Sequence, residues 1–262
     1  MILKSAGGTK SVILLTPFPS NLSDFTSKMG NLNGTQFLGN QVKMEGSEYN
    51  EWYGYLSDGL FLTQEDVDKS PKLNNSVKVG DIKYKDVNND GVINSNDMIP
   101  MGYNSVWPEI YYGFNVGLEW KGLGFNASFQ GVGNYTAYLS SNLYVPLIDN
   151  TNISQYSYNN RWTPETPNAR FPRLTTETVD NNLKTSSVWL ADRSFLKLRN
   201  CEIYYKLPSS WLSKIKMKNA KVYVRGVDLF SIDSIDLTDP EAMGNNVYPA
   251  TRSVHVGLSI GL

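Results

Sequence analysis

The stretch from Tyr112 to Gln130 alternates between apolar and polar side chains, and this period of two is the pattern that most restricts the fold. Successive side chains of a β-strand point to opposite faces, so each run predicts a strand with one apolar and one polar face. Lys121-Gly122 separates the two runs and predicts a tight hairpin turn. The run from Ser253 to Leu262 repeats the pattern and predicts a final strand of the same kind. The apolar rows are Tyr112, Phe114, Val116, Leu118 and Trp120, then Leu123, Phe125, Ala127 and Phe129, then Val254, Val256, Leu258, Ile260 and Leu262.

Two architectures accommodate such strands. In a soluble sandwich the apolar face packs on a second sheet, whereas in an outer-membrane barrel it faces lipid and the polar face lines the lumen. Tyr112 and Trp120 lie eight residues apart on the apolar face, which at ~3.3 Å per residue and ~40° of tilt spans roughly 20 Å, close to a ~25 Å lipid band. The opposite face is mostly Gly, Ser, Asn and Gln, which suit water better than a core. We therefore predict an all-β fold formed by strands of a large antiparallel transmembrane β-barrel with long extracellular loops.

Charge and reactive side chains exclude several function classes. The net charge is −1 and charged residues make up 19% of the chain, so no basic surface is expected to bind nucleic acid. The single cysteine, Cys201, excludes an internal disulfide and a cysteine-based zinc site, and the single histidine, His255, leaves no second histidine for a metal pair. Cys201 is expected to be a small strand residue and His255 to face the lumen. No nucleophile has a base beside it, so we predict that the chain is not an enzyme.

The stretch from Asp86 to Asp97 has the spacing of a twelve-residue calcium loop. A hard cation takes about six to eight oxygen ligands, and Gly91 stands at the sixth position, where such a loop turns sharply. Pro100 follows closely, so the loop is expected to join strands rather than helices. The alternative is a turn rich in Asn and Asp whose side chains act as local caps. The predicted ligands of Ca²⁺ are Asp86, Asn88, Asp90, the Val92 carbonyl, Asn94 and Asp97.

Residues 140–193 form a long segment rich in Asn, Tyr and Pro, without a regular period. A structureless segment of this length is unusual inside a compact domain, whereas a barrel carries it as a long extracellular loop. Two further strands are expected at 194–207 and 220–230. Each has a break in its alternation, so we expect β-bulges near Arg199 and at Gly226.

Three tryptophans are candidates for contact with a substrate or with a lid protein: Trp107, Trp162 and Trp189. Indole rings stack on sugars and on partner proteins. The same rings also pack within loops or anchor a barrel at the membrane interface, and the sequence does not favour one use over the other.

Several further motifs follow one another in a fixed order. They are Trp52-Tyr-Gly-Tyr, Asp58-Gly-Leu-Phe61, Gly80-Asp-Ile-Lys-Tyr-Lys-Asp-Val-Asn-Asn-Asp-Gly91, Arg161-Trp-Thr-Pro-Glu-Thr-Pro-Asn-Ala169, Ser194-Phe-Leu-Lys-Leu-Arg-Asn200, Tyr205-Lys-Leu-Pro208, Val222-Tyr-Val, Asp228-Leu-Phe230, Asp239-Pro-Glu241 and Tyr248-Pro-Ala-Thr-Arg252. Each motif alone is weak, but the ordered set is specific. Together they resemble the C-terminal part of the barrel of the SusC/RagA family of TonB-linked outer-membrane transporters.

The resemblance implies a plugged barrel of about 22 strands in the bacterial outer membrane. It implies import of oligosaccharides or peptides, a SusD-type surface lipoprotein as a lid, TonB as the source of energy, and contact with outer-membrane lipid. The match covers residues 21–262, whereas residues 1–20 have no regular pattern and are interpreted as a divergent or non-native start. The plug and most strands of the family have no counterpart here, so we expect this chain to be a fragment of such a transporter.

The alternative function is a secreted, calcium-stabilised β-sandwich that binds glycans or mediates adhesion. The calcium-type loop and the many aromatic residues suit it. The apolar run at Val12-Ile-Leu-Leu15 is too short for a convincing secretion signal, and the strand faces resemble those of a barrel lumen, so we expect the transporter fragment instead.

Overall fold

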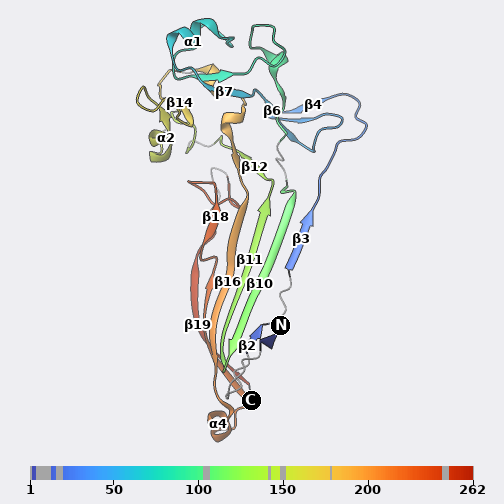
Figure 1. The fold of residues 1–262 in the computed structure, drawn as a ribbon, viewed down its shortest axis with the longest axis vertical. Coiled ribbons are helices and arrows are strands. Elements are labelled where there is room, and N and C mark those ends of the chain that lie inside the picture. The colour runs from blue at the N-terminus through green and yellow to red at the C-terminus, as the bar shows by residue number, and fades with distance from the viewer. Residues whose placement is uncertain are drawn as a thin grey trace.

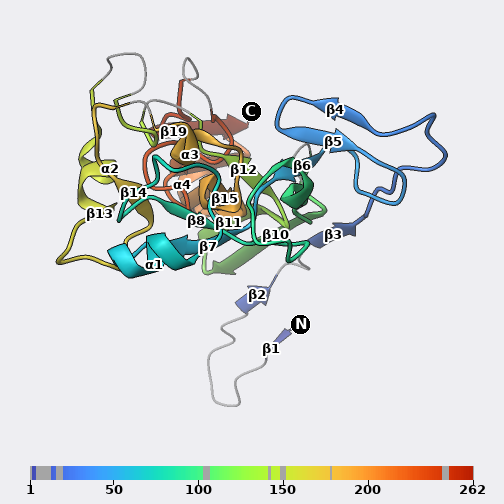
Figure 2. The same ribbon diagram turned by 90° about the horizontal axis from the view of Figure 1, so that it is seen from above.

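The computed structural model describes residues 2–3, 13–15, 20–102, 107–140, 143–147, 152–177, 179–243 and 248–261. Within these residues, a long curved sheet runs along the molecule, and a head of short strands and helices lies at one end of it (Figure 1). Seen from above, the hairpin of β4 (Gln36–Leu38) and β5 (Gln41–Lys43) projects to one side of the head, away from α1 (Gln64–Lys69) and α2 (Gln155–Asn159) (Figure 2). The molecule therefore has two regions of different construction.

The long sheet has nine strands, and all of its neighbouring strands are antiparallel. Its main path runs β1, β2, β10, β11, β16, β17, β19, while β3 also pairs with β10 and β18 with β16. Among the described residues the two ends of this path do not pair with each other. The predicted antiparallel β fold is thus confirmed, while closure into a barrel is not seen. The strands are β1 (Ile2–Leu3), β2 (Ile13–Leu15), β3 (Ser20–Asp24), β10 (Ile110–Trp120), β11 (Leu123–Gly133), β16 (Phe195–Lys206), β17 (Asn219–Val227), β18 (Ser231–Asp233) and β19 (Ser253–Gly261).

The hairpin predicted around Lys121-Gly122 is confirmed. β10 and β11 pair without interruption from Ile110 opposite Gly133 to Trp120 opposite Leu123. The two turn residues have φ of 50° and 87°. Two consecutive positive φ values are typical of the two-residue turns whose twist matches that of the flanking strands. The local sequence therefore fixes the register of this pair.

The β-bulge predicted near Arg199 is confirmed. Ser128 of β11 pairs with Asn200, but Phe129 pairs with Leu198, so Arg199 is an extra residue in β16. Lys197 and Glu202 consequently lie opposite Gln130 and Asn126, both on the polar face of β11. The bulge thus keeps the charged side chains of β16 on one face although its alternation is broken.

The prediction of a second β-bulge, at Gly226, is wrong. Gly226 pairs with Cys201 on one side and with Val254 on the other, and the register continues through it. A Cβ atom at Gly226 would lie 2.5 Å from Cδ1 of Leu229. The glycine therefore leaves room for a side chain that folds back over the strand, and the break in alternation marks the end of β17.

Three glycines of the sheet lie beneath tyrosine rings of neighbouring strands. Gly131 is paired with Tyr112, Gly124 with Tyr204 and Gly257 with Tyr223. A Cβ atom at these glycines would lie 2.0–2.3 Å from Cζ of the paired ring. The rings cover strand positions that lack a side chain, as in the aromatic pairs that stabilise glycines in sheets.

The head is folded around an aromatic and aliphatic core. Trp189, Phe171 and Ile82 are fully buried, and the core also contains Tyr55, Tyr84 and Ile93. Its remaining elements are β6 (Glu51–Gly54), β7 (Ser57–Leu60), β8 (Ile82–Tyr84), β9 (Ile99–Pro100), β12 (Thr136–Tyr138), β13 (Arg161–Trp162), β14 (Phe171–Arg173), β15 (Leu190–Asp192), α3 (Asp180–Leu183), η1 (Ser95–Asp97) and η3 (Ser187–Trp189). The expectation that 140–193 is structureless is wrong for the described residues, because this segment supplies both Phe171 and Trp189.

The opposite end of the sheet carries α4 (Ser209–Leu212) and η4 (Ser213–Ile215), which connect β16 to β17 (Figure 1). No described helix is long and apolar enough to cross a membrane. Most of residues 1–20, as well as Leu262, lie outside the described residues. In the part that is described, β1 and β2 form and β2 pairs with β10, so the expectation of no regular structure there is wrong.

Candidate functional site

The apolar side chains of the long sheet form rows that continue from strand to strand. We call this surface the apolar face. One row crosses Trp120, Leu123, Tyr205, Val222 and Leu258, and the next crosses Leu118, Phe125, Ile203, Val224 and Val256. Except for Phe125, these side chains are between 39% and 77% exposed. Exposed apolar surfaces of this extent are characteristic of contact with a membrane or another protein.

A sandwich requires a second sheet packed on this surface. The exposure of Ile203, Val224 and Val256 shows that no described part of the chain covers it there. The arrangement is the inverse of a soluble sheet, because the charged side chains lie on the other face.

The opposite surface, which we call the polar face, carries linked ion pairs along β16. Glu119 accepts hydrogen bonds from the Tyr204 hydroxyl at 2.8 Å and from Lys206 Nζ at 2.7 Å. Glu202 accepts hydrogen bonds from Lys221 at 2.9 Å and from Arg225 at 2.6 Å. Glu119 of β10 thus bonds to β16 across the intervening β11, and Glu202 joins β16 to the adjacent β17. This face suits a hydrated interior rather than an apolar core.

Near the head, the chain between β18 and β19 is held over the polar face by cations of β16. Lys197, whose side chain is 4% exposed, donates hydrogen bonds to Asp239 at 2.5 Å and to Glu241 at 2.8 Å. Arg199 pairs with Asp228 and with Glu241. Burial alone would raise the pKa of Asp239 and of Glu241, but their bonds to these cations outweigh it and lower both pKa values. Both acids are therefore anionic near neutral pH and fasten this segment to the sheet.

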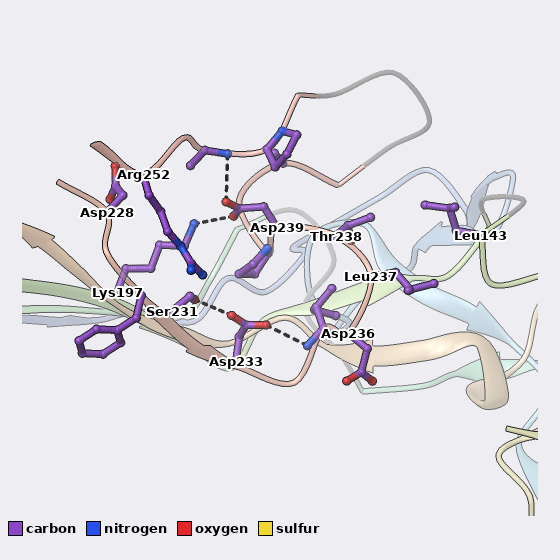
Figure 3. Close-up of a pocket in the computed structure, with 16 residues that line it drawn as sticks. Leu143, Lys197, Asp228, Ser231, Asp233, Asp236, Leu237, Thr238, Asp239 and Arg252 are labelled. Carbon is purple, nitrogen blue, oxygen red and sulfur yellow. Dashed lines mark hydrogen bonds and ion pairs between the residues drawn. The ribbon is translucent and has the colours of Figure 1, made fainter. Parts of the chain in front are cut away.

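A cavity of about 530 Å³ opens beside this segment (Figure 3). Lys197 and Arg252 point toward its centre, while the carboxylate of Asp233 is held by the Ser231 hydroxyl and by the backbone N–H of Ile235. Asp239 is occupied by Lys197 and the Ala250 N–H. The groups at its wall are thus mostly paired with one another.

The calcium-type loop is closed by its own hydrogen bonds. Asp86 accepts from the backbone N–H of Gly91 at 2.8 Å, and Asp90 accepts from the N–H of Val92 at 2.9 Å, which lowers the pKa of Asp90. Asn88 Nδ2 donates to Asp90 at 2.9 Å. These are the local caps of an Asn- and Asp-rich turn.

The second half of the loop is anchored by buried residues. Asp97 is fully buried and accepts hydrogen bonds from the N–H groups of Val87 and Asn94. Asn94 in turn accepts from the N–H of Asn96, and the Val92 side chain is exposed. No group of three or more His, Cys, Asp or Glu side chains that could hold a metal ion occurs among the described residues. The calcium site of the sequence analysis stays a prediction.

The three candidate tryptophans lie in different surroundings. Trp107 is exposed and stacks on Tyr49 with ring centroids 5.9 Å apart. Trp162 is partly buried and lies over Gly80, where a Cβ atom would be 2.4 Å from its ring. Trp189 is 2% exposed and donates its indole N–H to the Asn182 carbonyl at 3.0 Å. Trp162 and Trp189 thus pack within the head, and only Trp107 presents a broad surface for the predicted contact with substrate or lid.

Sequence reasoning missed a cluster of buried carboxyl groups where the head meets the sheet. Glu51 and Glu109 are buried, and Oε2 of Glu48 is enclosed beside them without a hydrogen-bond donor. Burial, together with the charges of Glu109 and Glu51, raises the pKa of Glu48 to about 7. Glu48 and Glu109 are far apart in sequence, so no local pattern could indicate the cluster.

Comparisons with known proteins give relatives of one kind. The TonB-dependent receptor P26 of Formosa agariphila is 29% identical over 265 residues, which cover 91% of this chain and 26% of that protein. The TonB-dependent receptor P3 of the same organism is 26% identical over 226 residues, covering 84% of this chain and 21% of that protein. This chain therefore spans about a quarter of the length of these relatives. No family model matches the sequence.

Solved structures give the same result for the fold. A chain in the structure of the RagAB peptide transporter matches with a TM-score of 0.70 and 19% identity, over 99% of this chain and 28% of that one. The RagAB peptide importer in its "open-open" state matches with a TM-score of 0.68 and 19% identity, over 100% of this chain and 27% of that one. The resemblance inferred from the motifs is confirmed. This chain is similar in sequence to part of TonB-dependent receptors and in fold to part of a SusC/RagA-type importer, that is, to transport proteins and not to enzymes.

Proposed function

We propose that this chain is a section of a TonB-dependent importer in the bacterial outer membrane. The apolar face contacts lipid, the polar face lines the interior of a barrel completed by further strands, and the head lies outside the bilayer. The observation that carries this proposal is the pair of exposed apolar rows, which continue in register across five strands from β10 to β19. An outer-membrane strand presents its apolar side chains outward in this way.

The cargo of the proposed importer is a peptide or an oligosaccharide. The matching structures are of a peptide importer, which supports the peptide. A SusD-type lipoprotein would cover the head, and TonB would supply energy to the complete protein. Trp107 and its stacked neighbour Tyr49 are the aromatic pair that we propose for contact with the lipoprotein or the cargo. The secreted sandwich has no comparable support, because the described residues place no second sheet on the apolar face.

Two neighbouring residues of β19 provide a test of the membrane placement. Val256 lies on the apolar face and is 77% exposed, whereas His255 is exposed on the polar face. The V256R and H255R variants would be mixed with phosphatidylcholine vesicles and separated by flotation. A cation facing lipid costs about 2–4 kcal/mol at the bilayer midplane, so V256R should float far less than the unmodified chain and H255R nearly as well. Equal flotation of the two variants would refute the proposed orientation.

We also propose that the 86–97 loop binds Ca²⁺ through Asp86, Asn88, Asp90, the Val92 carbonyl, Asn94 and Asp97. The support is their spacing and the positive φ of Gly91, 85°, which turns the loop. Titration with CaCl₂ should raise the unfolding temperature of the head, and D86N should abolish the increase. The exposed acid Asp68, in α1, provides the matched control D68N. If CaCl₂ does not raise the unfolding temperature, or raises it equally in D86N, the proposal is wrong and the loop is a turn closed by its own side chains.

A further inference from the structure

A second cavity lies at the end of the sheet away from the head, beneath α4. Its volume is about 340 Å³, far above the roughly 10–15 Å³ that a single water molecule needs. None of its lining residues is acidic. It is lined by Lys206, Leu207, Ser209, Leu212, Lys218, Asn219, Ala220, Lys221 and Ser259.

Two of its lysines face each other directly across adjacent strands. Lys206 of β16 is paired with Lys221 of β17, and Lys221 is paired in turn with Ser259 of β19. Like charges placed directly opposite in a sheet are destabilising. The pair lies beside the Tyr204 ring, whose centroid is 5.6 Å from Lys206 Nζ and 4.9 Å from Lys221 Nζ. The sheet thus holds two ammonium groups close together.

The neighbouring carboxylates compensate this charge incompletely. Lys206 pairs with Glu119, and Lys221 pairs with Glu202, which it shares with Arg225. Lys218, the third lysine of the cavity, is exposed and makes no ion pair within the described part of the chain. Residues 203–227 contain five lysines and one arginine but no acid. The cavity therefore has an excess of positive charge.

The groups around the cavity are suited to an anion with several oxygens. Lysine ammonium groups bind phosphate as point charges, and the hydroxyls of Ser209 and Ser259 and the amide of Asn219 are further hydrogen-bond donors. We propose that this cavity binds a phosphate group, either free or on a lipid headgroup, through Lys206, Lys218 and Lys221. Binding would relieve the repulsion between the opposed lysines. The site would hold with or without the membrane placement, because it depends on the polar face and the α4 connection alone.

Lys218 is the residue to change first, since its removal breaks no ion pair. Inorganic phosphate would be titrated into the whole chain in a neutral detergent at low salt, with binding followed by calorimetry. Loss of one charge-assisted contact should weaken binding about tenfold in K218Q, while K218R should retain it. Lys214 is exposed on the same connection but does not line the cavity, so K214Q should stay within about twofold of the unmodified chain.

A second arm identifies the source of the phosphate group. The same four proteins would be tested for flotation with vesicles of phosphatidylcholine alone and with added phosphatidylglycerol. If added phosphatidylglycerol increases flotation, and K218Q loses this increase while K214Q keeps it, the ligand is a lipid headgroup. If inorganic phosphate binds saturably and one-to-one but phosphatidylglycerol does not increase flotation, the ligand is a free anion. If neither probe binds, or if K214Q and K218Q weaken binding equally, the proposal is wrong.

Discussion

The head and the long sheet use the same kinds of side chain in opposite ways. In the head, Trp189 and Phe171 are stacked with centroids 5.6 Å apart and are almost completely buried. In the sheet, Ile203 and Val256 point into open space, while Glu202 is enclosed by Lys221 and Arg225 on the other face. The head buries its apolar side chains, as a water-exposed unit does, whereas the sheet exposes them on one face, which fits the lipid contact proposed above. The polarity of each face of an element therefore indicates whether that face lies in a polar or an apolar environment.

The largest effect that separates the two regions is expected from truncating their aromatic residues. W189A would remove the stack on Phe171 and the bond to Asn182, and should cost the head about 3–5 kcal/mol. W211A, at a side chain that is 62% exposed on α4, should change stability by less than about 0.5 kcal/mol. Chemical denaturation of the whole chain in detergent measures both. Similar losses would mean that the head lacks the independent core described above.

A smaller effect should reveal how the sheet is packed. G124A would place a Cβ atom 2.0 Å from Cζ of Tyr204, forcing the ring away and breaking its bond to Glu119. Overpacking of this kind costs about 1–3 kcal/mol. On the same strand, a Cβ atom at Gly133 would meet nothing closer than 3.5 Å, so G133A is the matched control. Denaturation midpoints that shift equally for both variants would contradict the role assigned to the tyrosine.

A third effect concerns the junction of the two regions and depends on pH. The pKa of Glu48 is raised from 4.5 to about 7 in the folded chain, in a site shared with Glu109, Glu51 and Lys28. The folded state therefore binds this proton more tightly than the unfolded state does. The contribution of this proton to the free energy of unfolding is fully present below pH 4.5 and is lost as the pH rises through 7.

E48Q should remove this dependence and make the folded chain more stable than the unmodified protein at pH 8. Thermal unfolding measured between pH 4.5 and 8 tests the change. E45Q, at an exposed acid of the same loop, should leave the pH profile as it is. A profile unaffected by E48Q would show that the carboxyl cluster does not couple the head to the sheet.

The long sheet could be predicted from the sequence because its signals are local. The alternation from Tyr112 to Gln130, the Lys121-Gly122 turn and the phase break at Arg199 each act within a few residues. The break at Gly226 was misread, because the same loss of alternation arises where a strand ends and Leu229 folds back.

The head could not be predicted in the same way, because residues far apart in sequence hold it together. Asn182 bonds both Ile82 and Asp81, about one hundred residues earlier, and Ser187 bonds Ser57. The segment around Asn182 has no period of its own and becomes ordered only through these partners. For the same reason the sequence indicated the tryptophans as contact residues without distinguishing buried Trp189 from exposed Trp107, and it gave no sign of the lysine-lined cavity.

The extra residue in β16 determines which changes of length that strand can accept. Arg199 has no partner in the β11 ladder, so it is the residue of β16 whose deletion disturbs the pairing with β11 least. Its removal would place Leu198 directly beside Asn200 and still opposite Phe129, so the strand would alternate regularly, with Lys197 kept on the polar face. The deletion would cost the ion pairs of Arg199 with Asp228 and Glu241 rather than the order of the two faces. We therefore expect related chains either to keep a residue at this position or to lack it, with both faces of the strand unchanged.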